Sequence, residues 1–88
     1  MKNIMLWLVL GTKGGNNRAR IMKKLHSRPY NANQLSKKLH LNYRTISHHL
    51  NILEKNNIVP SAGENYGVIY LLSDEAEKNY DSLNNIWV

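Results

Sequence analysis

The sequence of 88 residues predicts a single α+β domain, mostly helical, with one β-hairpin near its C-terminal end. Two observations support this fold class. Apolar residues recur at intervals of three and four through residues 18–55, which is the spacing of helices that bury one face. Residues 58–72 are richer in β-branched and aromatic side chains and contain a turn with Gly and Asn. A chain of this length closes one small core, so we expect one domain over residues 1–88.

The N-terminal segment begins with an uninterrupted apolar run, residues 4–10. The run is far shorter than the roughly 20 residues that a membrane span needs. Residues 11–15 contain no cleavage site of the kind that ends a secretion signal. We therefore expect a buried segment, either helix or strand, then a flexible glycine-rich joint over residues 11–15 and a helix capped by Asn16 or Asn17.

Three amphipathic helices follow the joint. The first covers residues 18–27. Asn31 has a Gln three positions later, as a capping box requires, and opens a second helix over residues 32–39. After a turn of three residues, Asn42 caps a third helix, residues 43–55.

The third helix has two different faces. Ile46, Leu50 and Leu53 recur at i, i+4 and i+7 and form a stripe that belongs in the core. Another face gathers the polar residues Tyr43, Arg44, Ser47, His48 and Asn51. A helix of this kind is held by its apolar stripe and leaves the polar face free for a partner.

A hairpin and a last helix complete the chain. Residues 58–59 predict the start of one strand and residues 68–72 a second, with a turn at residues 62–67. Ser73 caps the last helix. The apolar stripe of that helix consists of Ala76, Tyr80, Leu83 and either Ile86 or Trp87. A three-helix core with a two-stranded β-wing and a C-terminal helix is a winged helix-turn-helix. Its expected parts are residues 1–15 (N-terminal segment and joint), 16–72 (core) and 73–88 (C-terminal helix).

Positive charge is concentrated in the first part of the chain. Lys and Arg number 12 against 6 Asp and Glu, a net charge of +6. Residues 1–55 hold eleven of the basic side chains and one acid, which gives +10, whereas residues 56–88 hold one basic side chain and five acids, which gives −4. Such a balance indicates a polyanionic partner, either nucleic acid or an anionic membrane surface. The absence of cysteine excludes disulfides and thiolate metal sites and favours a cytoplasmic protein.

Residues 34–53 resemble the core of the ArsR-like winged-helix regulators, which include many small archaeal proteins. In that family a Thr-Val-Ser-x-His-Leu-x-x-Leu pattern marks the recognition helix and continues into a Gly-Leu-Val strand. Residues 45–53 match the pattern with conservative changes, and Asn57-Ile58-Val59 stands where the strand begins. The resemblance covers about residues 17–86. It implies a transcriptional regulator that binds double-stranded DNA sequence-specifically, with the helix 43–55 in the major groove.

The resemblance implies base contacts from the exposed face of the third helix. The guanidinium of Arg44 can bind O6 and N7 of guanine, and the amide of Asn51 can bind adenine in the same two-bond manner. Ser47 and His48 can bond to base edges, and Tyr43 can reach a phosphate or a thymine methyl.

Contacts to the phosphate backbone are expected from Lys37, Lys38 and Thr45, and from the wing. Members of the family usually carry a Lys or Arg in the wing, whereas Glu64 here would be repelled by phosphate. The remaining wing candidates are Asn65 and Tyr66. Compensating positive charge is expected from Lys13, Arg18 and Arg20.

The resemblance also bears on metal binding, because the family's metal sensors use Cys pairs in the recognition helix or His and Asp pairs in the C-terminal helix. This chain has no Cys and no His after His49. Adjacent residues on a helix point about 100° apart, so His48 and His49 do not share one ion. We interpret His49 as a packing residue with a hydrogen-bonded ring nitrogen, and we expect no metal and no cofactor.

The surplus of apolar residues at the two ends of the chain predicts a homodimer that reads a pseudo-palindrome. The expected interface residues are Ile4, Leu6, Trp7, Leu8 and Leu10 from the N-terminal run and Tyr80, Leu83, Ile86 and Trp87 from the last helix. The alternative is that Trp7 and Trp87 complete the core of a monomer.

Two other hypotheses remain open at this level. Residues 11–14 form a Gly-x-x-Gly sequence, as in the loop with which KH domains clamp RNA phosphates, although the apolar residue and the three strands expected around it are not visible. A winged helix can also serve only for protein assembly. No spacing of residues supports an enzyme or a Walker-type phosphate loop, and we expect no membrane partner.

Overall fold

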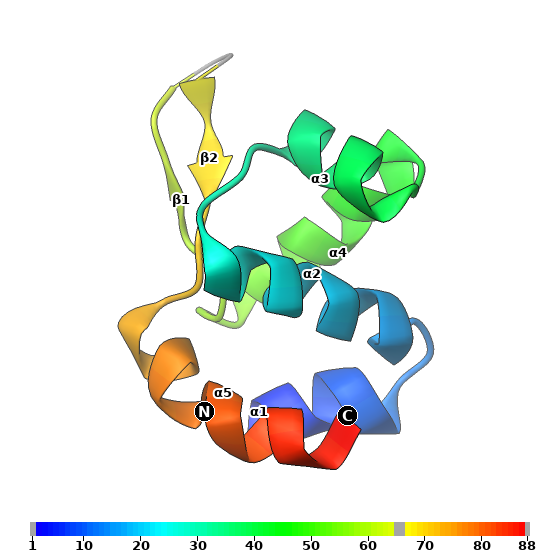
Figure 1. Ribbon diagram of the computed structural model, residues 1–88, viewed down its shortest axis with the longest axis vertical. Helices are drawn as coiled ribbons and strands as arrows, with labels where there is room; N and C mark the ends of the chain where they lie inside the picture. The colour runs from blue at the N-terminus through cyan, green and yellow to red at the C-terminus, as the bar shows by residue number, and fades with distance from the viewer. Residues whose placement is uncertain (1, 65–66, 88) are drawn as a thin grey trace.

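The computed structural model describes residues 2–64 and 67–87, except for the side chains of residues 82–87. Its elements are, in chain order, α1 (Lys2–Leu6), the π-helical turn η1 (Trp7–Gly11), α2 (Gly15–Ser27), α3 (Ala32–Leu39), α4 (Tyr43–Lys55), β1 (Ser61–Ala62), β2 (Ile69–Tyr70) and α5 (Asp74–Trp87). Figure 1 shows α1 and α5 together at one end, α2 across the middle, and α3, α4 and the hairpin toward the other end. The predicted α+β winged helix-turn-helix is confirmed.

The N-terminal apolar run is helical, which resolves the choice between helix and strand. α1 passes directly into η1, and Met5, Leu8 and Val9 of this stretch are buried. The prediction that Leu8 contacts a second copy is wrong, because its side chain is only 8 % exposed and lies in the chain's own core. A run in which every residue is apolar does not show which side chains face inward, and only the helix settles this.

The glycine-rich joint is a packed corner rather than a loose connection. Gly14 is the N-cap of α2 and has a φ of 86°, a backbone conformation that residues with a side chain rarely adopt. α2 begins at Gly15, so the prediction that Asn16 or Asn17 caps this helix is wrong. A methyl group on Gly15 would overlap the carbonyl oxygen of Val9, which means that the first turn of α2 presses directly against η1.

Side-chain caps set the starts of α3 and α4, as the sequence predicts. The Asn31 Oδ1 accepts from the Gln34 N–H at 2.7 Å, and the Gln34 Oε1 accepts from the Asn31 N–H at 2.9 Å, which completes a capping box. The Asn42 Oδ1 accepts from the Arg44 N–H at 2.7 Å. Between the two helices, His40 adopts a φ of 56° and reverses the chain within three residues.

The core is built around α4. Its predicted stripe of Ile46, Leu50 and Leu53 is buried. Ile58 and Val59 are also fully buried, but they do not start a strand, and that prediction is wrong. Both of their N–H groups donate to the Leu53 carbonyl, at 3.0 and 3.3 Å, so the chain folds back over the end of α4 before β1 begins.

The wing is a short antiparallel pair with Ser61 opposite Tyr70. β2 is much shorter than the predicted strand at residues 68–72. On its other edge, Tyr70 exchanges two backbone hydrogen bonds with Tyr30, at 2.8 and 3.1 Å. The wing is therefore anchored to the segment that leads into α3, and its position relative to α3 and α4, the helix pair, is fixed.

α5 packs back onto α2. The Ser73 Oγ accepts from the Ala76 N–H at 3.1 Å, so the predicted cap is confirmed. The rings of Tyr80 and His26 stack with their centroids 3.9 Å apart. The Nδ1 of His26 lies 3.0 Å from a carboxylate oxygen of Glu77. These contacts fasten the start of α5 to the end of α2.

The stacked ring of Tyr80 is only 4 % exposed, so the prediction that this residue lies in a dimer interface is wrong. Ala76 and Tyr80 face the core as predicted. The other interface predictions for α5, Leu83, Ile86 and Trp87, fall on side chains outside the described residues. Over the part of the chain that the structure describes, no helix is both long and apolar enough to cross a membrane.

Replacing Gly15 by Ala is expected to lower the free energy of unfolding by about 2 kcal/mol or more, because overfilling a packed site costs roughly 1–3 kcal/mol. Gly67 is the matched control, since a Cβ there would meet no described atom within 4 Å. Gly67→Ala should change the free energy of unfolding by less than about 0.5 kcal/mol. Urea denaturation followed by circular dichroism measures both, and equal midpoints for the two variants would contradict the packed corner.

Candidate nucleic-acid interface

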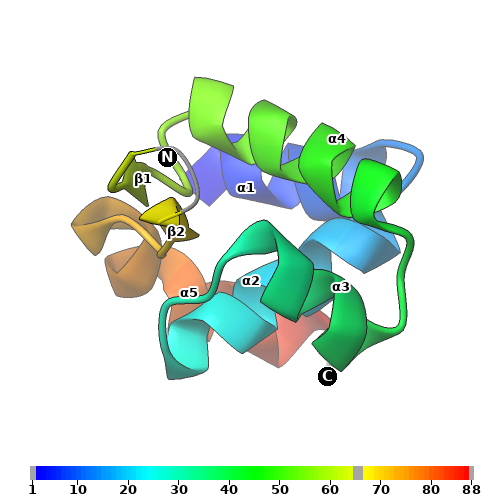
Figure 2. The same cartoon turned by 90° about the horizontal axis from the view of Figure 1, so that it is seen from above.

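The exposed face of α4 carries the side chains that the sequence singles out for base contacts. Tyr43, Arg44, His48 and Asn51 are exposed, and Ser47 is half-buried. In the view of Figure 2, α3, α4 and the two strands lie nearest the viewer, and α1 and α5 lie behind them. α4 therefore lies at the end of the molecule that also holds α3 and the wing.

The first turns of α4 border a hollow on the surface. It has a volume of about 440 Å³ and is lined by Asn42, Arg44, Thr45 and His48. The side-chain oxygen of Asn42 is already used for the helix cap. Of the residues that line this hollow, Arg44 carries the permanent positive charge. The arrangement leaves Arg44 free to bind an acceptor-rich edge.

Two hydrogen bonds fix the turn between α3 and α4. The Leu41 N–H donates to the Ser36 carbonyl at 3.0 Å, and the Ser36 hydroxyl donates to the Leu41 carbonyl at 2.5 Å. Lys37 and Lys38 follow directly in the last turn of α3 and are exposed. Positive side chains are favourable at a helix C-terminus, and here they stand beside the start of α4.

No described acid forms an ion pair with the cations of this face. Among the described residues, the ion pair formed is that of His26 with Glu77, and no Lys or Arg takes part in one. Lys37, Lys38 and Arg44 are therefore available to phosphate or to base edges. Thr45 is half-buried on α4, close to the same surface.

The wing brings no positive charge to this surface. The sequence has no Lys or Arg between Lys55 and Lys78, and Glu64 is exposed in the hairpin. The predicted wing contacts, Asn65 and Tyr66, lie outside the described residues.

The positive charge predicted to compensate for the wing is only partly available. Lys13 is exposed. Arg20 is half-buried and donates from Nη2 to the Leu39 carbonyl at 2.6 Å. Arg18 is buried, and the hypothesis that it supplies charge to DNA is wrong.

Arg18 instead forms a hydrogen-bond network inside the molecule. Its guanidinium donates to the carbonyl oxygens of Leu8 at 2.8 Å and Lys13 at 2.9 Å, and to the hydroxyl of Thr12. Its Nη1 lies 3.2 Å from the Nδ1 of His49 on α4. A guanidinium only donates, so Nδ1 accepts and the ring proton of neutral His49 lies on Nε2.

The spacing of residues in the sequence indicates that Arg18 is buried, whereas the count of basic residues does not. Arg18 precedes Ile21, Met22 and Leu25 by three, four and seven residues, and all three are buried on one face of α2. Helical spacing therefore places Arg18 on the apolar face, where a charged residue is retained when it is fully hydrogen-bonded. His49 is a packing residue with a hydrogen-bonded ring nitrogen, as the sequence indicates.

The arrangement of the described His, Asp and Glu side chains bears on metal binding. Within residues 2–64 and 67–81, no three His, Asp or Glu side chains gather where they could hold an ion. The rings of His48 and His49 are 5.3 Å apart at an angle of 60°, and His49 is turned toward Arg18.

Comparison with known proteins identifies the family of this chain. Residues 15–61, more than half of the chain, match the family model described as bacterial regulatory protein, arsR family. The chain belongs to the arsR family. The matched range contains α2, α3, α4 and the start of the wing, so it includes the whole helix pair and its polar face. The family and the fold are those of DNA-binding transcriptional regulators.

Several solved structures have a similar fold over almost the whole of this chain. The regulator HlyU from Vibrio vulnificus is 25 % identical with a TM-score of 0.75, covering 99 % of this chain and 88 % of its own. The repressor BigR from Xylella fastidiosa is 18 % identical with a TM-score of 0.76, covering 98 % and 86 %. A homodimeric winged helix-turn-helix DNA-binding domain from Mycobacterium bovis is 16 % identical with a TM-score of 0.73, covering 97 % and 76 %. No curated protein matches the sequence.

The buried pair of Arg18 and His49 predicts a pH-dependent stability. Burial, the charge of Arg18 and the nearby His48 lower the pKa of His49 in the folded protein. The unfolded chain has a His pKa of about 6.5, so it binds the proton more readily than the folded state does. Stability is therefore complete above pH of about 6.5 and is lost as the pH falls toward the lower folded pKa.

The variant His49→Asn should show a flatter pH dependence, since Asn offers a hydrogen-bond acceptor to Arg18 but does not titrate. His48→Asn, which removes only the smallest of the three causes, should keep most of the parent chain's dependence, because burial and Arg18 still lower the pKa of His49. The free energy of unfolding, measured by urea denaturation from pH 5 to pH 8, distinguishes the two. Parallel curves for the parent chain and His49→Asn would rule out a neutral His49 as the source.

Proposed function

We propose that this arsR-family regulator binds double-stranded DNA as a homodimer and reads each half-site with the exposed face of α4. The observation that carries the proposal is the free guanidinium of Arg44 on a helix whose opposite face is locked into the core. A rigidly held helix of this kind fits the major groove of B-DNA, while the preceding helix crosses the backbone. Such a regulator acts in the cytoplasm, where the DNA is.

Base readout is assigned to four residues of α4. Arg44 binds guanine, and Ser47 and His48 bond to base edges one turn further on. Asn51 stands seven residues after Arg44, about 10 Å along the helix axis, and reads adenine near the edge of the site. Tyr43, 56 % exposed at the helix start, reaches a phosphate or a thymine methyl.

Phosphate contacts are assigned to the residues that flank the reading helix. Lys37 and Lys38 precede it, and Thr45 lies on its first turn. Asn65 and Tyr66 of the wing complete the set. Because the wing adds only Glu64 as a charge, most of the electrostatic affinity comes from the helix pair.

The dimer contact is assigned to the exposed side of the N-terminal helix. Ile4, Trp7 and Leu10 are 44 %, 62 % and 58 % exposed and follow one another at intervals of three, and Leu6 is half-buried beside them. Large apolar side chains at this density on so short a segment favour a protein contact. The exposure of Trp7 argues against the alternative that it completes a monomer core. α5 lies against α1, so Leu83, Ile86 and Trp87 belong to the same proposed interface.

The two rival hypotheses are less well supported. The winged-helix fold is not that of a KH domain, and within residues 11–14 the Lys13 carbonyl already accepts from Arg18. A module for protein assembly alone would favour apolar or acidic groups on α4, whereas its exposed face is polar and basic.

Selection from a pool of randomised duplex DNA at physiological salt, with single-stranded RNA as competitor, tests the proposal. Enrichment of a two-fold symmetric sequence with half-sites about one helical turn apart is expected. Arg44→Ala should then lose roughly 1–3 kcal/mol of binding free energy and accept other bases at one position of each half-site. Binding of the selected duplex and of single-base variants is measured by fluorescence anisotropy.

Lys37→Ala is the control for Arg44→Ala, because it removes a charge without removing a base contact. It should weaken all duplexes about equally and lower the slope of log affinity against log salt by about 1 per phosphate lost. Failure to enrich any duplex, with no retention on DNA, would leave assembly as the function of this fold.

The dimer assignment makes a separate prediction. Trp7→Ser with Leu10→Ser should shift the protein from dimer to monomer in sedimentation at micromolar concentration, because both side chains are removed from the exposed apolar patch. Ile69→Ser is the matched control, since Ile69 is 39 % exposed but lies in the wing. A parent chain that sediments as a monomer at high micromolar concentration would overturn the dimer.

A further inference from the structure

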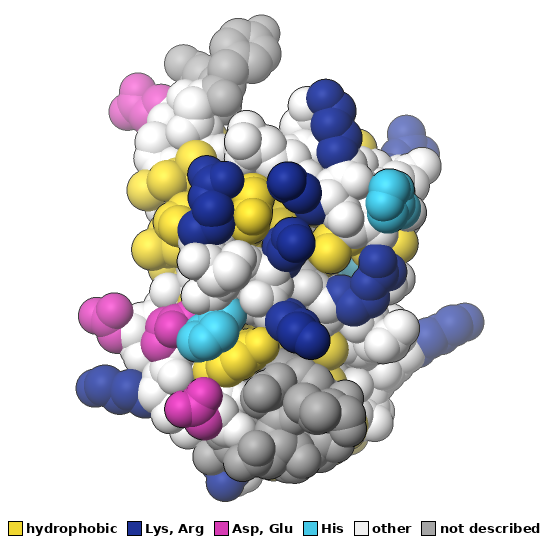
Figure 3. Space-filling model, viewed as in Figure 1, with side chains coloured by type: hydrophobic (Ala, Val, Ile, Leu, Met, Phe, Trp, Pro, Cys, Tyr) yellow, Lys and Arg dark blue, Asp and Glu magenta, His cyan; other side chains and the backbone are white. Residues whose placement is uncertain are grey.

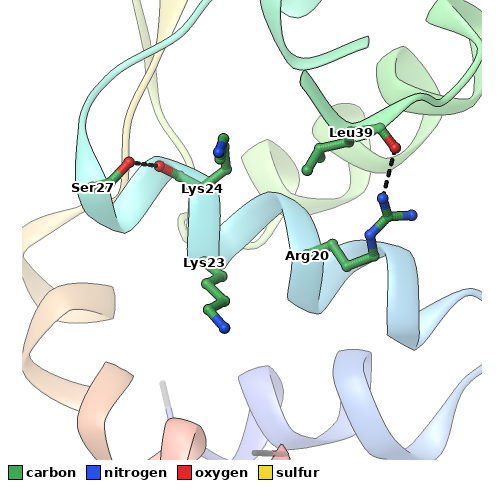
Figure 4. Close-up of a pocket in the computed structure, with 5 residues that line it drawn as sticks. All are labelled: Arg20, Lys23, Lys24, Ser27 and Leu39. Carbon is green, nitrogen blue, oxygen red and sulfur yellow. Dashed lines mark hydrogen bonds between the residues drawn. The ribbon is translucent and has the colours of Figure 1, made fainter. Parts of the chain in front are cut away.

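A groove separate from the exposed face of α4 runs between α2 and the end of α3. It has a volume of about 460 Å³ and is lined by Arg20, Lys23, Lys24, Ser27 and Leu39. Hollows of roughly 300–1,000 Å³ are the size that accepts small molecules. Figure 4 shows Arg20 reaching from α2 to the Leu39 carbonyl, Lys24 on the α3 side of the helix and Lys23 extending away from α3.

The groove is lined by three cations, and no described acid neutralises them. None of its three cations forms an ion pair with a described acid. Figure 3 shows Lys and Arg side chains gathered over α2 and α3, while the Asp and Glu side chains visible on this face lie toward the left of the view. Three unpaired cations that border one hollow favour an anion carrying more than one charge.

A smaller hollow extends the groove along α2. It has a volume of about 170 Å³ and is lined by Asn16, Ala19, Arg20 and Lys23. Arg20 and Lys23 border both hollows, so the charged groups stand between the two. Leu39 and Ala19 offer apolar contact on either side, which suits a phosphate group attached to a small organic body.

The guanidinium of Arg20 is positioned before any ligand arrives. Its Nη2 donates to the Leu39 carbonyl at 2.6 Å, and its Nη1 lies 3.5 Å from the Asn17 Oδ1. A guanidinium has five N–H groups in a rigid fork, so further donors remain for two oxygens of a phosphate. The ammonium groups of Lys23 and Lys24 sit on long, flexible stems. Lys24 lies on the α3 side of α2, and Lys23 borders the groove from the other side.

We propose that the groove between α2 and α3 binds a small phosphate-bearing anion through Arg20, Lys23 and Lys24. A concave site of this size suits a compact ligand better than a duplex, whose phosphates are met by the exposed side chains of the helix pair. Where the chain acts as the proposed DNA regulator, binding is coupled to the helix pair, because Arg20 bonds to the last residue of α3. An anion held by the remaining donors of Arg20 therefore acts on the end of α3 and shifts the equilibrium affinity for DNA.

Titration with inorganic pyrophosphate at constant ionic strength tests the site without DNA. Binding is measured by calorimetry and by amide chemical shifts of ¹⁵N-labelled protein. Saturable binding with shifts concentrated in α2 and at residues 39–41 is expected. The double variant Lys23→Gln/Lys24→Gln should weaken pyrophosphate binding at least about 10-fold, as expected for the loss of two charge-assisted contacts.

The matched control is Lys37→Gln/Lys38→Gln, which removes the same charge from exposed positions on α3. This control should change pyrophosphate affinity less than about 2-fold, the size of a general charge effect. Thermal denaturation confirms that both variants fold. Equal weakening in the two variants, or binding that does not saturate, would overturn the site. So would a loss of DNA affinity in Lys23→Gln/Lys24→Gln as large as in the control, because the groove would then be a DNA surface. Failure of the chain to select any duplex would leave the pyrophosphate result standing.

Discussion

The buried guanidinium of Arg18 is the interaction on which the arrangement of the helices depends. It bonds to the Leu8 carbonyl in η1, to Thr12 and Lys13 in the corner and to His49 on α4. A charge removed from water costs several kcal/mol unless its hydrogen bonds are replaced. Here carbonyl, hydroxyl and imidazole acceptors replace them, and no described acid does. Loss of the guanidinium would also remove hydrogen bonds from three separate segments, including the buried bond to the His49 ring.

This network links the two proposed interfaces of the molecule. η1 carries the exposed Trp7 and Leu10, and α4 carries the exposed Arg44. Because Arg18 bonds to both elements, the N-terminal helix cannot move relative to α4 without breaking hydrogen bonds in the core. A dimer built on the N-terminal helix would therefore hold its two reading helices at a fixed separation, which a two-fold symmetric DNA site requires.

Local chemistry made much of the helical part predictable from sequence. The caps at Asn31 and Asn42 and the stripe on α4 depend on residues within a turn or two of one another, and all three are confirmed. Ile58 and Val59 were predictable only as buried, because their β-branched side chains suit a strand equally well and their partner is a carbonyl of α4.

Candidate contacts on α4 were likewise predictable as exposed or buried, since a helix with one apolar stripe leaves little choice for the other faces. The roles of the basic residues before α3 could not be predicted in this way. Arg18 and Arg20 are two positions apart with the same side chain, yet one is buried beside His49 and the other borders a groove at the end of α3. Two residues that are two positions apart on α2 point to different faces of the helix, and a count of charges does not show which face each occupies.

The distribution of acids follows from the same geometry. Asp74, Glu75 and Glu77 occupy the first turn of α5, where negative side chains are favoured by the helix dipole. Figure 1 places α5 at the end of the molecule away from α3 and the tip of the hairpin. Acids in this position stabilise the helix and remain at the far end of the molecule from the surface proposed to contact phosphate. Positive and negative side chains are thus concentrated at opposite ends of the molecule. In the proposed complex, the field of a duplex would turn the end with α3 and α4 toward the DNA before any base is contacted.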